Sequence, residues 1–122
     1  MLTEYSAVRQ DEGIFKKRWF GDDFFDLILW QDEEGDIVRF ELCYDKEQNE
    51  HAITWRKEAG FAHLKVDDGE GETGKYKMSP ILIADGIFNN KKIAERFFSE
   101  SKSIENNLSQ FIYRKIFDYP AP

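Results

Sequence analysis

The chain has 122 residues, of which 41% are hydrophobic and 16% aromatic, and it carries a formal net charge of −7. This length and apolar content suit one domain with a large aromatic core and argue against a disordered chain. The acidic balance disfavours nucleic acid and anionic membrane surfaces as partners, because both are negatively charged. No apolar run reaches the ~20 residues that a membrane-crossing helix needs.

The cysteine count and the first residues bear on where the protein resides. The single cysteine, Cys43, excludes an internal disulfide and is typical of a reducing compartment. Residues 1–13 lack a basic start followed by an apolar stretch, so we expect no signal peptide there. We therefore expect a cytoplasmic protein with one domain over residues 1–122, in which residues 1–12 form a short helix or lie loose.

Residues 14–67 predict a series of strands separated by turns. The segments 14–20, 23–31, 37–44, 51–57 and 61–67 are rich in β-branched and aromatic residues, and polar or glycine-containing segments separate them. This order predicts a four- to five-stranded antiparallel meander. A further short edge strand fits residues 78–86, because Pro80 cannot donate a hydrogen bond to a central strand.

Three hairpin tips, placed at residues 34–35, 47–48 and 58–59, bring these strands into one consistent register. A shift of one residue in any pair would turn that strand's apolar side chains to the opposite face of the sheet. We therefore expect one apolar face, made of Phe25, Leu27, Leu29, Val38, Phe40, Leu42, Ile53, Trp55, Ala62, Leu64 and Val66.

The C-terminal third predicts two amphipathic helices that cover the apolar face. Residues 89–103 and 104–119 both repeat apolar side chains at the three- and four-residue spacing of a helix. Asn89 or Asn90 is placed to cap the first helix and Ser103 the second. The expected fold is therefore α+β, an antiparallel meander with two C-terminal helices packed on one face.

The same register predicts which side chains occupy the other, open face of the sheet. They mix aromatic, cationic and polar groups, which is typical either of cross-strand charge pairs on a solvated face or of a surface that binds a partner. Both interpretations stay open at this point. Under the second, the binding residues for an unknown protein, a small molecule or a second copy of the chain are Trp30, Arg39, Thr54, Arg56, Phe61 and Lys65.

Three further residues on the predicted open face have side chains that can carry out catalysis. Glu41 and His63 would pair as acid and base, and Cys43 would lie diagonally from His63, close enough for a thiolate–imidazole pair. A free cysteine in a strand is more often a small hydrophobic residue than a nucleophile. His51 falls on the core side beside Tyr44, where we expect a hydrogen-bonded structural histidine.

Known motifs for catalysis, nucleotides and metals are missing from the sequence, so we expect no cofactor. Residues 67–77 carry four carboxylates among glycines, but a calcium loop needs glycine at its sixth position and glutamate at its twelfth. Counted from Asp68, those positions hold Thr73 and Ser79. We therefore interpret residues 67–77 as a mobile acidic loop and expect no metal site.

The order of motifs between residues 18 and 83 resembles a family of short bacterial proteins that has no assigned activity. The resemblance is carried by RWFGDDFFDLILWQDEEGDIVRFELCYDK, HAITWR, GFAHLKVDDGE and KYKMSPIL. It implies a bacterial cytoplasmic domain and assigns no role to any residue. The expected function is a non-enzymatic binding or protein-interaction module that uses the open sheet face. The alternative is a small enzyme that uses Glu41 and His63 on that face.

Overall fold

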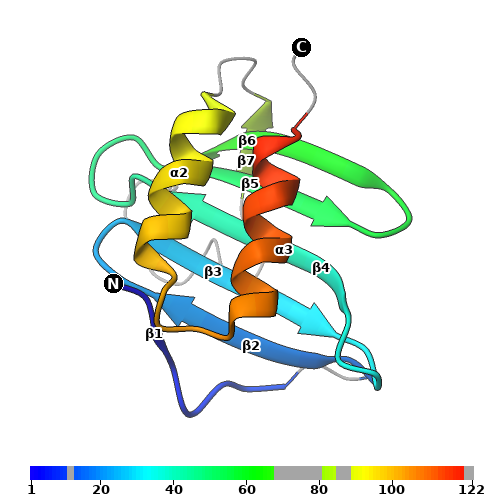
Figure 1. Ribbon diagram of the computed structural model, residues 1–122. Helices are drawn as coiled ribbons and strands as arrows, with labels where there is room; N and C mark the ends of the chain where they lie inside the picture. Colours follow the sequence, from blue (N-terminus) through cyan, green and yellow to red (C-terminus); the bar gives the residue numbers. More distant parts are fainter. Residues whose placement is uncertain (11–12, 68–80, 85–88, 120–122) are drawn as a thin grey trace.

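The computed structural model describes residues 1–10, 13–67, 81–84 and 89–119. Within them, seven strands form one antiparallel sheet in which each strand pairs with the next along the chain (Figure 1). Helices α2 (Asn90–Glu100) and α3 (Asn106–Phe117) lie side by side across one face. The strands are β1 (Thr3–Glu4), β2 (Lys16–Gly21), β3 (Phe25–Gln31), β4 (Ile37–Tyr44), β5 (His51–Arg56), β6 (Gly60–Asp67) and β7 (Ile81–Ala84).

The α+β meander with two helices on one face is therefore confirmed, and the described sheet has more strands than the four or five predicted. The extra strands are its two edges. β7 confirms the short edge strand expected within residues 78–86. The other edge, β1, was not predicted. Among the described residues no helix has the length and apolar composition needed to cross a membrane.

The first residues are anchored to the sheet and to α2, so the prediction that they are loose or helical is wrong for this part. Glu4 pairs with Phe20, and the amide of Tyr5 donates to the Trp19 carbonyl at 2.9 Å. The side chain of Leu2 is 1% exposed, and its amide donates to the carbonyl of Glu100. Residues 2–5 are held mainly by backbone hydrogen bonds. Such bonds require no periodic pattern of side chains, so the sequence contains no signal for them.

The predicted register is confirmed between β3, β4 and β5. Leu27 pairs with Leu42, which in turn pairs with Ile53, and Phe40 pairs with Trp55. One prediction at the start of β4 is wrong. Trp30 pairs with Arg39 but Gln31 with Ile37, so a bulge places Val38 outside the ladder. Ile37 belongs to the core in place of Val38.

The predicted register of β5 with β6 is wrong by one residue. A two-residue tip at 58–59 would pair Arg56 with Phe61, whereas the structure pairs Arg56 with Gly60. Three residues form the tip, and Gly60 follows them with φ +84°, a conformation that glycine adopts at low cost. The side chains of Phe61, Ala62, His63 and Leu64 consequently face the side opposite to the predicted one.

The core fills the layer between the helices and the sheet. The Asn89 side chain accepts from the amide of Lys92, which confirms the first predicted cap. The second is wrong, because α3 begins at Asn106 and the Ser103 hydroxyl donates to the carbonyl of Leu2. The most deeply buried core side chains are Leu2, Phe20, Phe25, Leu27, Leu29, Phe40, Leu42, Ile53, Ala94, Phe97, Ile112 and Ile116.

Candidate functional site

The shift in β6 separates the two predicted acid–base residues. Glu41 pairs with Thr54 and lies on the outer face, the side of the sheet away from the helices. His63 pairs with Ile53, faces the helices and is 5% exposed. The prediction that Glu41 and His63 share a face is therefore wrong. Cys43, on the outer face opposite Ala52, is separated from His63 in the same way.

His63 belongs to a buried ring stack on the helix-covered side. The hydroxyl of Tyr44 lies 2.7 Å from His63 Nε2, and the ring of His51 lies parallel to that of His63 with centroids 5.3 Å apart. His51 Nδ1 donates to the carbonyl of Asn49 at 2.7 Å. The rings of Tyr119 and His63 meet edge-on, with their centroids 6.3 Å apart. His51 is thus a hydrogen-bonded, buried residue, as expected, and His63 belongs to the same structural cluster.

Cys43 is buried, which limits its reactivity. Burial raises the pKa of its thiol, and the nearby carboxylates Glu50, Glu41 and Asp26 raise it further. A thiol with a raised pKa is uncharged at neutral pH, and the thiolate is the nucleophilic form. Cys43 therefore acts as a small apolar residue packed against Ala52.

Three of the six predicted binding residues meet around a hollow on the outer face. Its volume is about 560 Å³, within the usual range for ligand pockets of roughly 300–1,000 Å³. We call it the outer hollow. It lies where β3, β4 and the β5–β6 turn come together, and its walls are Phe15, Trp30, Asp32, Val38, Arg39, Arg56, Lys57 and Glu58.

Trp30 and Arg39 contact each other on the wall of the outer hollow. The guanidinium of Arg39 lies 4.3 Å from the ring centre of Trp30, and its Nη2 donates to Glu41 at 2.7 Å. The ammonium of Lys17 lies 5.8 Å from the same ring. Cation–π contact and the ion pair hold the Arg39 side chain in one orientation, so its remaining N–H donors point in fixed directions.

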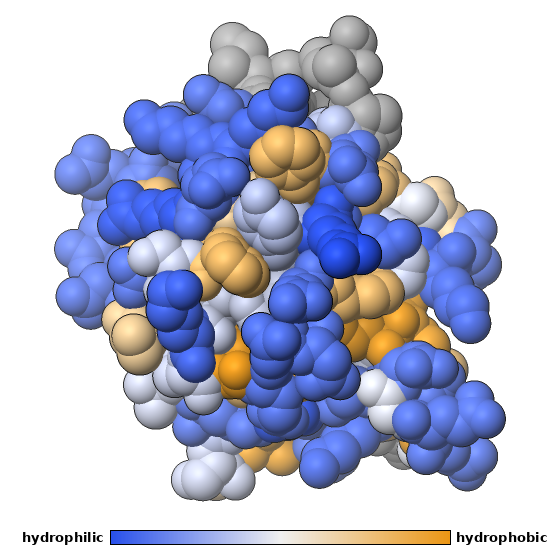
Figure 2. Space-filling view, in the orientation of Figure 1, coloured by the Kyte–Doolittle hydropathy of each residue, from blue (hydrophilic) through white to orange (hydrophobic). Residues whose placement is uncertain are grey.

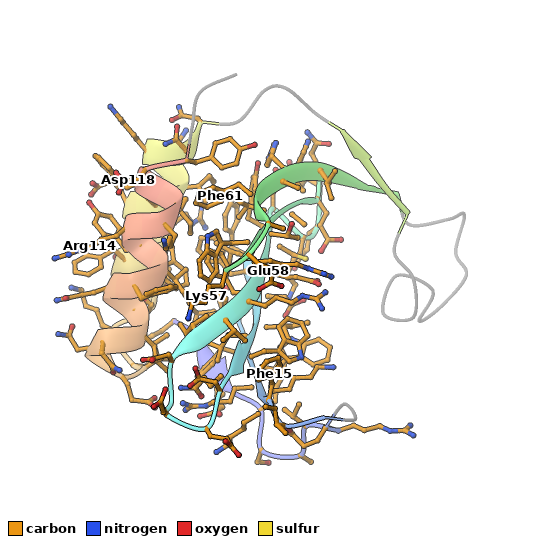
Figure 3. The ribbon with its side chains drawn as sticks, turned by 90° about the vertical axis from the view of Figure 1, so that its right-hand side faces the viewer. Phe15, Lys57, Glu58, Phe61, Arg114 and Asp118 are labelled. Carbon is orange, nitrogen blue, oxygen red and sulfur yellow. The ribbon has the colours of Figure 1, made fainter. Side chains whose placement is uncertain are left out.

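The rim of the outer hollow is more exposed and carries both signs of charge. Arg56, Lys57 and Glu58 are exposed, and neither of the two cations forms an ion pair with a described residue. Phe15 is 43% exposed, large for an aromatic side chain, and lies on the outer side of the sheet in Figure 3. The hollow thus offers apolar surface beside cations.

The other three predicted binding residues lie elsewhere. Thr54 is on the outer face beside Glu41 but does not line the hollow. Phe61 lies between the sheet and the helices, with its ring 5.3 Å from that of Tyr119 (Figure 3). Lys65 pairs with His51, so its strand position is on the helix-covered side. The prediction that Phe61 and Lys65 are on the open face is wrong for the same reason as for His63.

Five lining residues were missed by the sequence reasoning, among them Asp32, which lies just beyond the end of β3. Phe15 lies one residue before β2, and alternation places it on the same face as Lys17 and Trp19, so the sequence did contain a signal for it. Lys57 and Glu58 belong to a hairpin tip, where alternation ends and side-chain direction depends on the turn. Val38 enters the hollow through the bulge, which alternation alone does not predict.

One group of carboxylates in the described residues is close enough to hold a cation. Ligand oxygens of Asp32, Glu34 and Asp36, at the β3–β4 tip, lie within 4.8 Å of one another. Asp32 Oδ1 already accepts from the amides of Glu34 and Asp36, at 2.9 and 3.0 Å. These bonds explain the cluster as a turn stabilised by an aspartate. The predicted acidic loop, apart from Asp67, lies outside the described residues.

Comparison with known proteins adds no further constraint on the site. No family model, curated protein or solved structure matches the chain. The resemblance to a family of short bacterial proteins therefore stays a prediction. The contacts of the described side chains are what supports a function.

Proposed function

We propose that the protein is a non-enzymatic, cytoplasmic protein-interaction module that holds its partner at the outer hollow. The observation that carries the proposal is the convergence of Trp30, Arg39 and Arg56 around that hollow. Tryptophan and arginine are the residue types that most often dominate the energy of protein interfaces, typically from pockets near the centre. The partner is another protein or a second copy of this chain.

The charges of the outer hollow indicate the chemistry of the partner segment. Its lining has three cationic side chains and two acidic ones, in a protein whose net charge is −7. A segment that places a carboxylate beside an apolar side chain would pair with Arg56 or Lys57 and cover Phe15. Exposed charges of this kind mainly raise the association rate and select the partner.

The enzymatic alternative loses the geometry on which it was based. Glu41 and His63 lie on opposite sides of the sheet, and the Cys43 thiol is buried. A general base must reach the proton that it removes through direct contact or one water. The members of each predicted pair, Glu41–His63 and Cys43–His63, lie on opposite faces of the sheet, so neither pair meets this requirement.

Site-specific photo-cross-linking in living bacteria tests the proposed function. Photo-reactive benzoylphenylalanine replaces Phe15 in one variant and Arg114 in another. Arg114 is exposed on α3, on the opposite side of the molecule (Figure 3). We expect discrete protein adducts from position 15 and none from position 114. An adduct of twice the monomer mass would identify a second copy as the partner. No adduct from position 15, or the same adducts from both positions, would contradict the proposal.

A further inference from the structure

A second hollow lies on the helix-covered side of the sheet, between the start of α3 and the β3–β4 and β5–β6 tips. Its volume is about 570 Å³. We call it the helix-side hollow. Apolar surface is visible beside α3 in the view that shows this side (Figure 2). The lining residues used below are Asp36, Trp55, Lys57, Asn107, Phe111 and Lys115.

Two aromatic side chains, Trp55 and Phe111, form part of the walls of the helix-side hollow. Trp55 is buried, and its ring stacks on that of Phe40 with centroids 5.9 Å apart. The ring of Phe111 meets Trp55 edge-on at 5.4 Å. Phe111 is half-buried, so part of its ring remains available to a ligand. Such walls favour a flat, apolar ligand body over a strongly hydrated one.

Lys115 places a positive charge on these walls. Its Nζ lies 4.7 Å from the ring centre of Trp55 and 5.4 Å from that of Phe111. Within the described part of the chain it forms no ion pair. The Lys115 side chain is therefore half-buried, and two aromatic rings hold its ammonium in place. The ammonium has no counter-ion among the described residues. A second ammonium, that of Lys57, lines the same hollow.

We propose that the helix-side hollow binds a small aromatic carboxylate. The ligand's ring would pack beside Phe111 and add a further π face to the Lys115 ammonium. Its carboxylate would accept hydrogen bonds from Lys115, Lys57 and the Asn107 amide group, all of which are donors. Asp36, an acid at the exposed hairpin tip, also lines the hollow and disfavours ligands with several negative charges. A single carboxylate is therefore the expected charge.

Nuclear magnetic resonance titration tests this proposal with 1-naphthoate as the probe and 1-naphthalenemethanol as its neutral counterpart. We expect saturable shifts of the Asn107, Phe111 and Lys115 amides and of the Trp55 indole with 1-naphthoate. The neutral alcohol should bind about tenfold more weakly, the effect of one charge-assisted hydrogen bond. Equal affinities, or no saturable shift at millimolar probe, would overturn the proposal.

Lysine variants tie the binding to the ammonium groups. Lys115→Met keeps an apolar stem over Trp55 and should weaken 1-naphthoate binding about tenfold. The matched control is Lys102→Met, because Lys102 also lies over an aromatic ring, 5.2 Å from the centre of Phe98, but does not line the hollow. If Lys115→Met fails to fold, the exposed Lys57→Met provides the same comparison. Unchanged affinity in the folded lysine variant, or an equal loss in Lys102→Met, would overturn the proposal. Shifts centred on Trp30 and Arg39 would place the probe in the outer hollow and overturn this assignment alone.

Discussion

The hydroxyl of Tyr44 lies 2.7 Å from Nε2 of His63, on the side of the sheet that the helices cover. Both side chains are buried, at 8% and 5% exposure. A hydrogen bond between two buried polar groups spares both of them the cost of burial without a partner. This contact shows why His63 fits the helix-covered side, although a histidine suggests an outward-facing, reactive residue when the sequence is considered alone.

Replacing Tyr44 by phenylalanine should therefore cost stability. Tyr44→Phe keeps the ring in the stack but removes the hydroxyl from His63 Nε2, and the expected loss is about 1–3 kcal/mol in the free energy of unfolding. Urea denaturation followed by tryptophan fluorescence measures it. Tyr113→Phe is the control, because the Tyr113 hydroxyl donates to Glu95 in an exposed pair at 3.1 Å. That change should cost less than about 0.5 kcal/mol. Equal costs for the two variants would argue against a buried Tyr44–His63 bond.

The conformation of Gly60 sets which face His63 takes, and it leads to a second prediction. A Cβ at Gly60 would meet no atom within 4 Å, so the cost of a side chain comes from its φ of +84°. Gly60→Ala should lower the free energy of unfolding by about 1–2 kcal/mol. Gly60→Asn should lower it less, because asparagine tolerates this conformation better. Thermal and urea unfolding of the two variants check this order, and an alanine variant as stable as the parent would show that the turn differs.

Sequence reasoning succeeded where alternation was strong and the turns were simple. The pairs Leu27–Leu42 and Phe40–Trp55 followed from apolar residues that had to meet on one face. It failed at Val38 and Gly60, where a bulge and a longer turn each add one residue. Both are local backbone choices whose effect reaches a whole strand, because the side-chain period in a strand is two.

The candidate site was predictable to the extent that it lies on β3, β4 and β5. Trp30, Arg39 and Arg56 were found because their strands have the predicted register. Phe61, His63 and Lys65 were misplaced because all three are on β6. The helix-side hollow depends on how α3 packs over two hairpin tips, and one-dimensional periodicity contains no information about such packing.

The side chain of Gln10 takes the place of a neighbouring strand beside Lys17, in the part of β2 that β1 does not pair with. Its Oε1 accepts from the amide of Lys17 at 2.8 Å, and its Nε2 donates to the Lys17 carbonyl at 2.9 Å. Unpaired edges attract other strands, so this arrangement protects the sheet from edge-to-edge association. Gln10→Ala should speed hydrogen exchange of the Lys17 amide about fivefold, the equivalent of a ~1 kcal/mol hydrogen bond.

A matched variant separates the two halves of this contact. Gln10→Glu keeps an acceptor for the Lys17 amide but loses the donor to the Lys17 carbonyl. Its Lys17 amide should exchange close to the parent rate, while the amides of β3 should be unchanged in both variants. Equal exchange of Lys17 in the parent and in Gln10→Ala would show that Gln10 does not protect this edge.

Arg18 links β2 to β1 and to the start of α3, and it predicts a dependence of stability on pH. Its guanidinium donates to Glu4 at 2.8 Å and to Glu105 at 2.7 Å. Hydrogen bonds from Arg18 hold the pKa of both glutamates below the usual 4.5. A carboxyl group whose pKa is lower in the folded state stabilises the fold above pH 4.5, and this stabilisation is lost as the pH falls through the folded-state pKa.

Arg18→Met should therefore lower the free energy of unfolding at pH 7 more than at pH 3. Both glutamates are more than one-third exposed, so solvent screening keeps the difference small. Urea denaturation between pH 3 and pH 7 measures it. Arg114→Met serves as the control, because Arg114 is exposed and forms no ion pair with a described residue. An Arg18 variant whose stability changes with pH as the parent's does would contradict this account of Arg18.

Charge reversal at Arg56, combined with a cross-linker at Phe15, tests most directly whether a protein partner binds at the outer hollow. Benzoylphenylalanine replaces Phe15 in the parent, in Arg56→Glu and in Arg114→Glu, and adduct yield is measured in living cells. We predict that Arg56→Glu lowers the yield at least fivefold, because an acidic partner segment would meet a like charge, whereas Arg114→Glu leaves it unchanged. A yield that Arg56→Glu does not alter, with the folded state intact by circular dichroism, would contradict binding of a protein partner at the outer hollow.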